Sequence, residues 1–422
     1  MRAADLGPVP HGERTQSALD LFLIFAGANI VATTLQAGAA LAGTFGPAAG
    51  FGLIVVGSVA GSALVASLAP IGPWLGVPSV VAARAALGFR GAGLVALLLY
   101  LTNFAWIALN NAIAASVVAE ALGLHGWQAP LAVVLGLAAT FVVSRGPRAV
   151  GLADRVAVPL MCLVGLLITW AILRVPAPPA AAPPSAGQDA LTGLGWISVL
   201  KGLDLVVGYQ VSWILMFADY SRYTPSARQS AIAVFLGLAV TSVWFMGLGL
   251  AAARLAGSTD PGLMIAATGL HRLGALLVAL ATITTNFVNI YLSSLAWKSL
   301  FPRSGDQASI WSIGIIGSAL GVASATLLER FADFMLILGS LLVPAGGVLL
   351  AHFFFYDRST VVADLYDRRG PYGRHWGVSI PGVTAWAAGS VTYFAAAAIG
   401  STLPSLIVAM LTYLAAARAL RK

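Results

Sequence analysis

The residues of this 422-residue sequence that could do chemistry are uncharged polar side chains inside long apolar stretches. Gln36 and Gln210 each lie near the middle of such a stretch, and both stretches also carry glycines. An unpaired amide that faced lipid would cost free energy, so we expect both amides to face the interior of a helix bundle. There each could donate and accept hydrogen bonds, which is the chemistry of binding a neutral polar ligand.

A second group of polar side chains lies in one apolar stretch, where Asn103, Trp106 and Asn110 follow one another about a helical turn apart. Trp106 and Asn110 are four residues apart, so they share one face of a helix. A tryptophan in a membrane helix often belongs to the aromatic belt at the lipid interface. Trp106 lies well inside its stretch between two amides, which favours a pocket where its π-face stacks on a flat ring.

A third group combines adjacent hydroxyls with amides: Thr284, Thr285, Asn286 and Asn289. Such a cluster of hard neutral oxygens suits an alkali cation. The carboxylates nearest to these stretches (Asp20, Asp204 and Asp219) lie close to predicted helix ends. This favours sodium over a carboxylate proton relay, with proton coupling as the alternative.

Signatures of an enzyme or of a resident cofactor are lacking in the sequence. It contains no GxSxG, no P-loop and no carboxylate pair within an apolar stretch, and its five histidines are not at metal-ligand spacing. The single cysteine, Cys162, excludes a disulfide within the chain and a thiolate metal cluster. An intramembrane enzyme or a channel is therefore the weaker class. Nucleic-acid binding is improbable because the arginines are scattered singly.

The elements that must position these groups are transmembrane helices. The chain is 59% hydrophobic and 9% charged, with a mean hydropathy of +0.90, whereas soluble domains carry roughly 25% charged residues. This predicts an all-α polytopic membrane protein in the lipid bilayer. Twelve apolar stretches fit transmembrane helices, at 19–43, 50–70, 92–122, 129–144, 156–173, 197–217, 231–253, 273–297, 309–327, 334–356, 380–397 and 402–417.

The basic residues predict the orientation of these helices. Of the 23 Lys and Arg residues, 18 fall in segments on one side of the membrane and 5 on the other. The positive-inside rule places the richer side, and with it both termini, in the cytoplasm. We therefore expect a multi-pass protein of the inner (plasma) membrane.

The order of the stretches suggests two similar halves. A Pro- and Ala-rich external connector at 174–196 separates the first five stretches, 19–173, from the next five, 197–356. Two halves of matching length fit an inverted repeat in which the first helix of each half is interrupted, although chance would also produce equal halves. The remaining segments are a cytoplasmic N-terminal segment, a cytoplasmic loop, two extra helices and a cytoplasmic C-terminus, at 1–18, 357–379, 380–417 and 418–422.

Five motifs resemble the nucleobase:cation symporter-1 family, also called the purine-cytosine permease family, and within it the shorter bacterial cytosine permeases. They are GPVP at 7–10, GPWLGVP at 72–78, RAALGFRG at 84–91, ADYSRY at 218–223 and TTN at 284–286. The resemblance implies a leucine-transporter-type fold of five plus five helices with two helices added at the C-terminus. It also implies alternating access, in which a neutral nucleobase-like ring moves inward together with Na⁺ or, alternatively, H⁺.

The resemblance also assigns residues. It implies that the substrate is bound by Gln36, Asn103, Trp106, Asn110, Tyr209, Gln210, Ser212, Trp213, Asn286 and Asn289. The cation site would use carbonyls of Ala32, Leu35 and Ala281 and the hydroxyls of Thr284 and Thr285. Asp219 and Arg222 lie three residues apart after the sixth stretch, and we expect them to brace an inner gate.

Two departures from the family pattern bear on the substrate. Gln210 stands where relatives usually carry an aromatic residue, and Asn110 is shorter than the glutamine of some relatives. Cytosine is the leading substrate, and the alternatives are purines, a hydroxymethylpyrimidine-type thiamine precursor, and hydantoin or allantoin. We expect the protein to work as a monomer without a bound cofactor.

Overall fold

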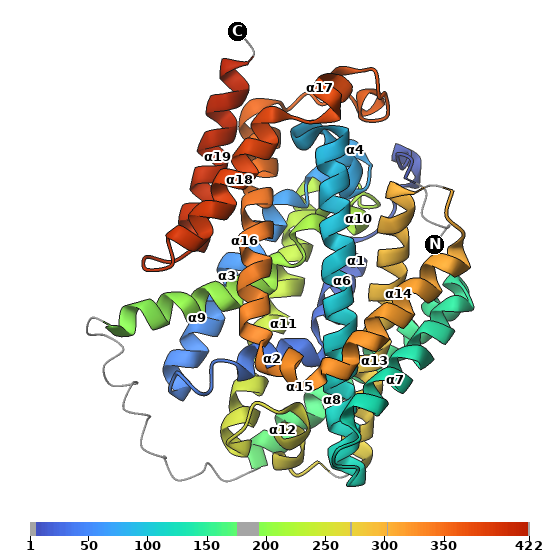
Figure 1. Cartoon of the computed structure of the whole chain (residues 1–422), viewed down its shortest axis with the longest axis vertical. Helices are drawn as coiled ribbons and strands as arrows, with labels where there is room; N and C mark the ends of the chain where they lie inside the picture. The colour runs from blue at the N-terminus through green and yellow to red at the C-terminus, as the bar shows by residue number, and fades with distance from the viewer. Residues whose placement is uncertain (1–5, 175–193, 271, 302, 421–422) are drawn as a thin grey trace.

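The computed structural model describes residues 6–174, 194–270, 272–301 and 303–420, and within these ranges the chain forms helices and no strand (Figure 1). Most of the predicted external connector, 174–196, lies outside the described residues. The all-helical fold follows from the composition, because backbone polar groups inside a membrane must be paired within the protein.

Seven helical segments among the described residues are long and apolar enough to cross a membrane, and a bent pair of helices makes an eighth. The seven segments are α3 with α4 (Pro47–Leu68, Ile71–Leu75), α6 (Arg84–Leu122), α9 through α10 (Leu194–Val211, Phe217–Ser221), α11 (Ala227–Ala256), α13 (Arg272–Leu300), α16 with a π-helical turn (Phe331–Leu350, Ala351–Tyr356) and α19 (Thr402–Ala419). The bent pair is α1 and α2 (Ala18–Asn29, Ala32–Ala39).

The other predicted stretches fall on shorter or less apolar helices. These are α7 (Gln128–Ser144), α8 (Pro147–Arg174), α14 (Asp306–Leu320) and α18 (Ile380–Ala395). Short connecting helices complete the chain: α5 (Ser79–Ala82), α12 (Pro261–Ala267), α15 (Ser324–Glu329) and α17 (Arg374–Gly377).

Breaks in two helices bear on the predicted boundaries, and one of these predictions, the single stretch 309–327, was wrong. Helix α6 is broken at Gly88, whose φ of 77° is not helical, so its uninterrupted part begins close to the predicted residue 92, and the turn before the break starts at Arg84, which donates to Leu365 O at 2.9 Å. The stretch 309–327 is not one helix, since α14 ends at Leu320 and a 3₁₀ turn precedes α15. That turn begins at Gly321, and glycine favours helix termination.

The first predicted interruption is confirmed. Helix α1 ends at Asn29, and α2 begins at Ala32 after a bend of 59°. The break exposes backbone groups that must find other partners. Thr34 Oγ1 donates to the Asn29 carbonyl at 2.5 Å, and Asn29 Nδ2 donates to Leu238 O of α11 at 3.1 Å. The interruption is therefore held by side chains on both sides of it.

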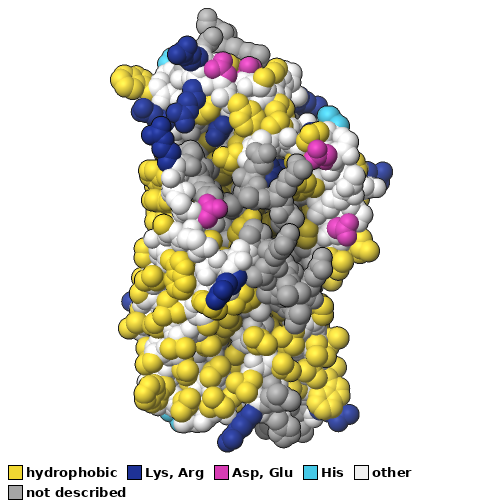
Figure 2. Space-filling view, turned by 90° about the vertical axis from the view of Figure 1, so that its right-hand side faces the viewer, with side chains coloured by type: hydrophobic (Ala, Val, Ile, Leu, Met, Phe, Trp, Pro, Cys, Tyr) yellow, Lys and Arg dark blue, Asp and Glu magenta, His cyan; other side chains and the backbone are white. Residues whose placement is uncertain are grey.

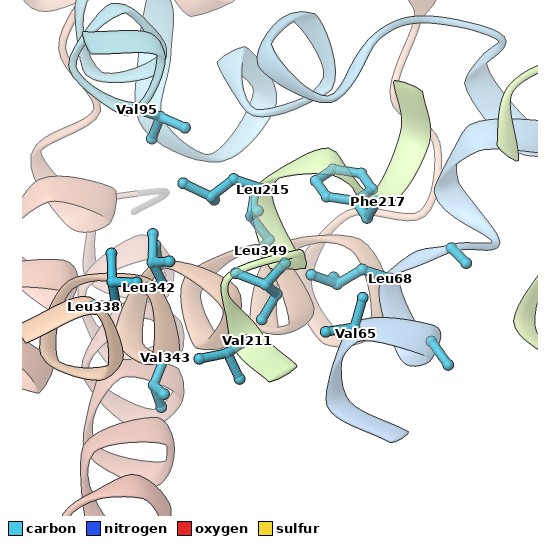
Figure 3. Packing of buried hydrophobic residues seen from close by; sticks show 14 of the residues in the cluster. Val65, Leu68, Val95, Val211, Leu215, Phe217, Leu338, Leu342, Val343 and Leu349 are labelled. Atoms are coloured by element: carbon cyan, nitrogen blue, oxygen red, sulfur yellow. The ribbon is translucent and has the colours of Figure 1, made fainter. Parts of the chain in front are cut away.

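A second interruption lies in the sixth stretch. Helix α9 ends at Val211, and a 3₁₀ turn at Ile214–Met216 leads into α10. Ser212 Oγ donates to the Tyr209 carbonyl at 2.7 Å at the end of α9. Apolar side chains hold this broken segment in place, as Figure 3 shows for Val211, Leu215 and Phe217 among residues of α3 and α16.

Close backbone contact fixes α2 against α11. A Cβ atom on Gly38 would overlap the Met246 carbonyl oxygen, and one on Gly249 would overlap the Leu35 carbonyl oxygen. Both positions therefore require glycine. On the other side of the bundle α6 packs along α13, and α18 and α19 form a hairpin beside α16 (Figure 1).

The surface matches a membrane protein. On the face in Figure 2, hydrophobic side chains cover most of the lower part, and Lys and Arg side chains gather toward the upper end. Large apolar side chains such as Leu173 and Val391 are more than half exposed. An apolar band of this extent would be unfavourable in water and is typical of a surface in lipid.

Candidate substrate and cation sites

Both helix interruptions border one internal cavity of about 40 Å³. Among the described residues, those that line it are uncharged and come from the α1–α2 break, α6, the end of α9 with its turn, and α13: Ala28, Val31, Thr33, Asn103, Trp106, Asn110, Tyr209, Ser212, Trp213, Met216, Thr285 and Asn289. A cavity without charge, with amides, hydroxyls and a large ring on its wall, suits a neutral polar ligand.

The ring of Trp106 is held by edge contacts from two aromatic neighbours. Tyr209 lies 5.8 Å away, centroid to centroid, at an interplanar angle of 89°, and Phe334 lies 5.3 Å away at 72°. Asn103 and Asn110 lie one turn before and after Trp106 on α6, and all three line the cavity. The spacing of these three residues in the sequence therefore correctly predicted that they share one face of α6.

An amide network lies behind Trp106, between α6 and α13. Asn110 Nδ2 donates to Asn286 Oδ1 at 3.2 Å, and Asn289 Nδ2 donates to the same oxygen at 3.4 Å. Asn286 Nδ2 donates to Ile107 O at 3.1 Å and to Asn111 Oδ1 at 2.8 Å. Asn286 is thus fully engaged with protein groups, whereas Asn110 Oδ1 is buried without a protein partner.

Three residues predicted to touch the substrate do not line the cavity. Gln36 Nε2 donates to Thr259 O at 3.0 Å, one turn further along α2 than the cavity residue Thr33. Gln210 is fully buried against Gly61 of α3, because successive helical side chains point about 100° apart and its neighbour Tyr209 takes the cavity face. Asn286 lies in the amide network behind the cavity.

Sequence reasoning missed several residues of this site. Thr33, Met216 and Ala28 line the cavity, and Phe334 of α16 supports Trp106 from a distant part of the chain. The signal for Thr33 was available, since it is a polar residue directly after the interruption of a helix. Nothing in the local sequence distinguishes Phe334 from other apolar residues of α16.

Three of the five predicted cation ligands line a smaller cavity of about 10 Å³, close to the space one water molecule needs. These are Ala32, Leu35 and Ala281; the other described lining side chains are apolar except Thr282, and neither Thr284 nor Thr285 is among them. The hydroxyl of Thr284 lies 2.7 Å from the Ala281 carbonyl oxygen, and the hydroxyl of Thr285 lies 3.4 Å from it.

The Leu35 carbonyl departs from the predicted set. It packs against Gly249 of α11, so its oxygen faces that helix. The Ala281 carbonyl accepts hydrogen bonds from both threonine hydroxyls within α13, and Ala281 and Ala32 both line the smaller cavity. Thr285 lines the larger cavity and donates to the carbonyl of Ala281 at the smaller one, so it links the two.

The predicted gate residues lie in and after α10. Asp219 hydrogen-bonds with Ser79 of α5. Arg222 is 7% exposed, and its Nη2 donates to Tyr223 Oη at 2.9 Å. Gln16 N, in the segment before α1, donates to Tyr223 O at 3.0 Å, so this turn also contacts the N-terminal segment.

The chain is similar to known proteins over nearly its whole length. Residues 8–416 match the family model described as a permease for cytosine/purines, uracil, thiamine and allantoin. The cytosine permease of Escherichia coli K12 is 27% identical over 359 residues, which cover 83% of this chain and 81% of that protein. The putative purine-cytosine permease YxlA of Bacillus subtilis is 25% identical over 395 residues, covering 87% and 82%.

Solved structures support the fold. Mhp1, a nucleobase-cation-symport-1 family transporter, superposes in its inward-facing conformation with a TM-score of 0.79 at 19% identity, covering 98% of this chain and 93% of that one. Its closed conformation with bromovinylhydantoin bound gives a TM-score of 0.75 at 18% identity. The matched relatives are permeases and not enzymes. The cavity, the interrupted helices and the match over residues 8–416 together place this chain in the family of membrane permeases for cytosine/purines, uracil, thiamine and allantoin.

Proposed function

We propose that the protein imports a neutral nucleobase-like heterocycle by cation symport. The observation that carries the proposal is the uncharged cavity in which Trp106 lies between Asn103 and Asn110. A flat ring would stack on the tryptophan while the amides hydrogen-bond to its edge. No charged side chain among the described lining residues would pair with a nucleotide or an amino acid.

Cytosine is our leading substrate, because the E. coli relative is a cytosine permease. Purines, a hydroxymethylpyrimidine-type thiamine precursor, allantoin and hydantoin are the alternatives. The family description includes thiamine and allantoin, and the Mhp1 structure holds a hydantoin derivative, which supports keeping them in the test panel.

The transport cycle we propose is alternating access between two five-helix halves, 19–173 and 197–356, with the helices of 380–417 added to them. The interrupted helices α1–α2 and α9–α10 support an inverted repeat within twelve transmembrane helices. The cavity of about 40 Å³ has room for roughly three waters, so a ring would need the lining side chains to move apart. That movement would couple substrate binding to the exchange between the outward-open and inward-open states of the transporter.

For the coupled ion we propose Na⁺ at Ala281, Thr284 and Thr285 beside Ala32, with H⁺ as the alternative. Hydroxyl and carbonyl oxygens suit a hard alkali cation. Thr285 lines the larger cavity, and its hydroxyl donates to the carbonyl of Ala281, which lines the smaller one. This link would let substrate and ion stabilise the same arrangement of α13 against the helix break.

We further propose a monomer in the inner membrane with both termini in the cytoplasm. Labelling of Ser226→Cys, at the start of α11, tests the orientation. A membrane-impermeant maleimide should label it only after the cells are permeabilised. Labelling in intact cells would place this turn, and the gate beside it, outside.

The decisive test of the substrate is a binding panel on the purified protein with cytosine, uracil, adenine, hypoxanthine, allantoin and hydroxymethylpyrimidine, with and without Na⁺. A ligand at a hundred times its Kd should stabilise the protein by about 2.7 kcal/mol, seen as a thermal shift. Trp106→Ala should abolish the shift, whereas Trp170→Ala, on an exposed part of α8, should leave it unchanged. A shift with an amino acid and with no ring compound would overturn the proposal.

A further inference from the structure

One stripe of α6 faces outward over the first turns after the Gly88 break. Arg90, Leu94, Leu97 and Leu101 follow one another at intervals of four, three and four residues, so they lie on one face of the helix. Arg90 is exposed, and the three leucines are 42%, 38% and 51% exposed. The stripe therefore has a positively charged end followed by an apolar surface about two helical turns long.

The level of this stripe in the membrane follows from the helix that carries it. The predicted transmembrane stretch of α6 is 92–122, so Arg90 lies directly before it and the three leucines lie within it. The start of α6 is at the upper end of the molecule in Figure 1, the end at which Lys and Arg side chains gather in Figure 2. Arg90 is thus at the level of the lipid headgroups, where a long basic side chain can reach a phosphate while its stem stays on apolar surface.

A left-handed turn exposes a tryptophan at the same level, before α18. Among the described residues, His375 and Trp376 are the two other than glycine with a positive φ, at 50° and 63°. Such a backbone costs free energy, so the surrounding contacts must impose it. The turn leaves the Trp376 side chain 84% exposed, four residues before α18 begins at Ile380. Tryptophan prefers this position at the membrane surface.

Backbone contacts with α6 impose the turn and place it beside Arg90. Ser379 N donates to the Leu87 carbonyl of α6 at 2.9 Å. A Cβ atom on Gly88 would lie only 2.6 Å from the Gly377 carbonyl oxygen, so the two backbones are in close contact. Arg90 Cγ lies 3.6 Å from the position that a Cβ on Gly377 would take. The turn is therefore fixed next to the basic end of the α6 stripe.

The end of α13 extends the apolar part of this surface. Trp297 of α13 lies 5.1 Å, centroid to centroid, from Tyr100, which is adjacent to Leu101 in α6. Phe301 follows at 4.3 Å from Trp297 and is 51% exposed. Leucine side chains and aromatic rings thus form a continuous surface that fits an acyl chain.

We propose that Arg90 and Trp376 bind the headgroup of an anionic phospholipid of the cytoplasmic leaflet, with an acyl chain along the leucines of α6. The guanidinium would donate charge-assisted hydrogen bonds to the phosphate, and the indole N–H is a second donor at the same level. Because 18 of the 23 basic residues fall on this side of the membrane, an anionic headgroup is favoured over a zwitterionic one. Neither residue lines the transport cavity, so this lipid site depends on the proposed orientation and not on the substrate.

The experiment is a titration of the purified full-length protein with phosphatidylglycerol or phosphatidylcholine of identical acyl chains, read by native mass spectrometry. The wild type should bind the first phosphatidylglycerol at least about fivefold more tightly than the first phosphatidylcholine. Arg90→Gln and Trp376→Ala should each reduce this ratio to within about twofold. Arg228→Gln and Trp127→Ala remove an exposed arginine and an exposed tryptophan elsewhere and should keep the ratio.

A backbone variant tests the turn without removing either side chain. Gly88→Ala would place a methyl group against the Gly377 carbonyl and displace Trp376, so it should also lower the ratio. Gly123→Ala is the matched control, because Gly123 also has a positive φ, ends the same helix and has open space around its Cβ position. Should Gly88→Ala not fold, the two side-chain variants still decide.

The outcomes separate the lipid site from the transport function. Equal binding of the two lipids to the wild type would overturn the proposal, and so would an unchanged ratio in both Arg90→Gln and Trp376→Ala. Displacement of the lipid by inorganic phosphate alone would show a phosphate site and would overturn the role of the acyl chain. Arg90→Gln and Trp376→Ala should bind the transported ring with wild-type Kd, so failure of the substrate panel leaves the lipid titration decisive on its own.

Discussion

The hydroxyl of Tyr209 lies 2.6 Å from Thr34 Oγ1, and this contact joins the two interrupted helices of the protein. Tyr209 belongs to the last turn of α9, and Thr34 to the first turn of α2. Thr34 in turn donates to the carbonyl of Asn29, where α1 ends. The same tyrosine ring packs edge-on against Trp106, so one side chain connects both breaks with the proposed stacking surface.

Tyr209→Phe should therefore reduce transport while the protein still folds. The change removes only the hydroxyl and leaves the ring against Trp106. We expect uptake to fall about tenfold, the equivalent of one buried hydrogen bond of about 1.4 kcal/mol. Tyr100→Phe, where the ring packs on Phe104 and Trp297, is the control and should transport normally. If Tyr209→Phe transported as well as Tyr100→Phe, the hydrogen bond between the two helix breaks would not be needed for transport.

Removal of the threonine hydroxyls tests the cation site. Thr284→Ala combined with Thr285→Ala should abolish sodium-stimulated uptake and leave weak sodium-independent binding, because a cation with fewer oxygen ligands does not recover its hydration energy. Thr392→Val, which removes a hydroxyl of α18 that donates to Ala388 O, should keep the stimulation. If wild-type uptake does not depend on sodium and is lost when the proton gradient is removed, H⁺ is the coupled ion.

The buried Arg222 tests the proposed inner gate. Its guanidinium contacts Tyr223 and lies 3.5 Å from Gly7 O of the N-terminal segment through Nη1. Arg222→Ala should lower the uptake rate at least fivefold with little change in equilibrium binding, because it affects the exchange between states and not the cavity. Arg228→Ala removes the same charge from an exposed position of α11 and should be silent. If Arg222→Ala weakened equilibrium binding by the same factor as the uptake rate, Arg222 would not act in the gate.

Asp204 should be important for stability. Its carboxylate accepts from Ser401 N at 2.7 Å, Thr402 N at 3.0 Å and Thr402 Oγ1 at 2.7 Å, so it caps the start of α19 from α9. Asp204→Ala would leave buried N–H groups unpaired and should destabilise the protein by about 3 kcal/mol. The apparent melting temperature in detergent measures this effect. Asp333→Ala, in an exposed pair with Arg330, should lower the melting temperature far less.

Helix content and the location of the site follow from the sequence for clear physical reasons. Apolar stretches in lipid must pair their backbone groups internally, which forces helices wherever such a stretch occurs. A helix repeats every 3.6 residues, so the spacing of Asn103, Trp106 and Asn110 is by itself enough to place them on one face of α6. The glycines and polar residues at 27–38 likewise indicate where the first helix is interrupted.

Only the tertiary structure decided which polar groups reach the cavity. Tyr209 and Gln210 are adjacent and equally plausible in sequence, and the packing of Gly61 against Gln210 turns the tyrosine inward. Gln36 donates to the Thr259 carbonyl, and the Leu35 carbonyl packs against Gly249 of α11. Both contacts depend on the close packing of α2 against a helix that lies about 200 residues further along the chain. The direction of the amides is decided the same way: the Ile107 carbonyl on α6 orients Asn286 on α13, and such a contact exists only once the two helices pack together.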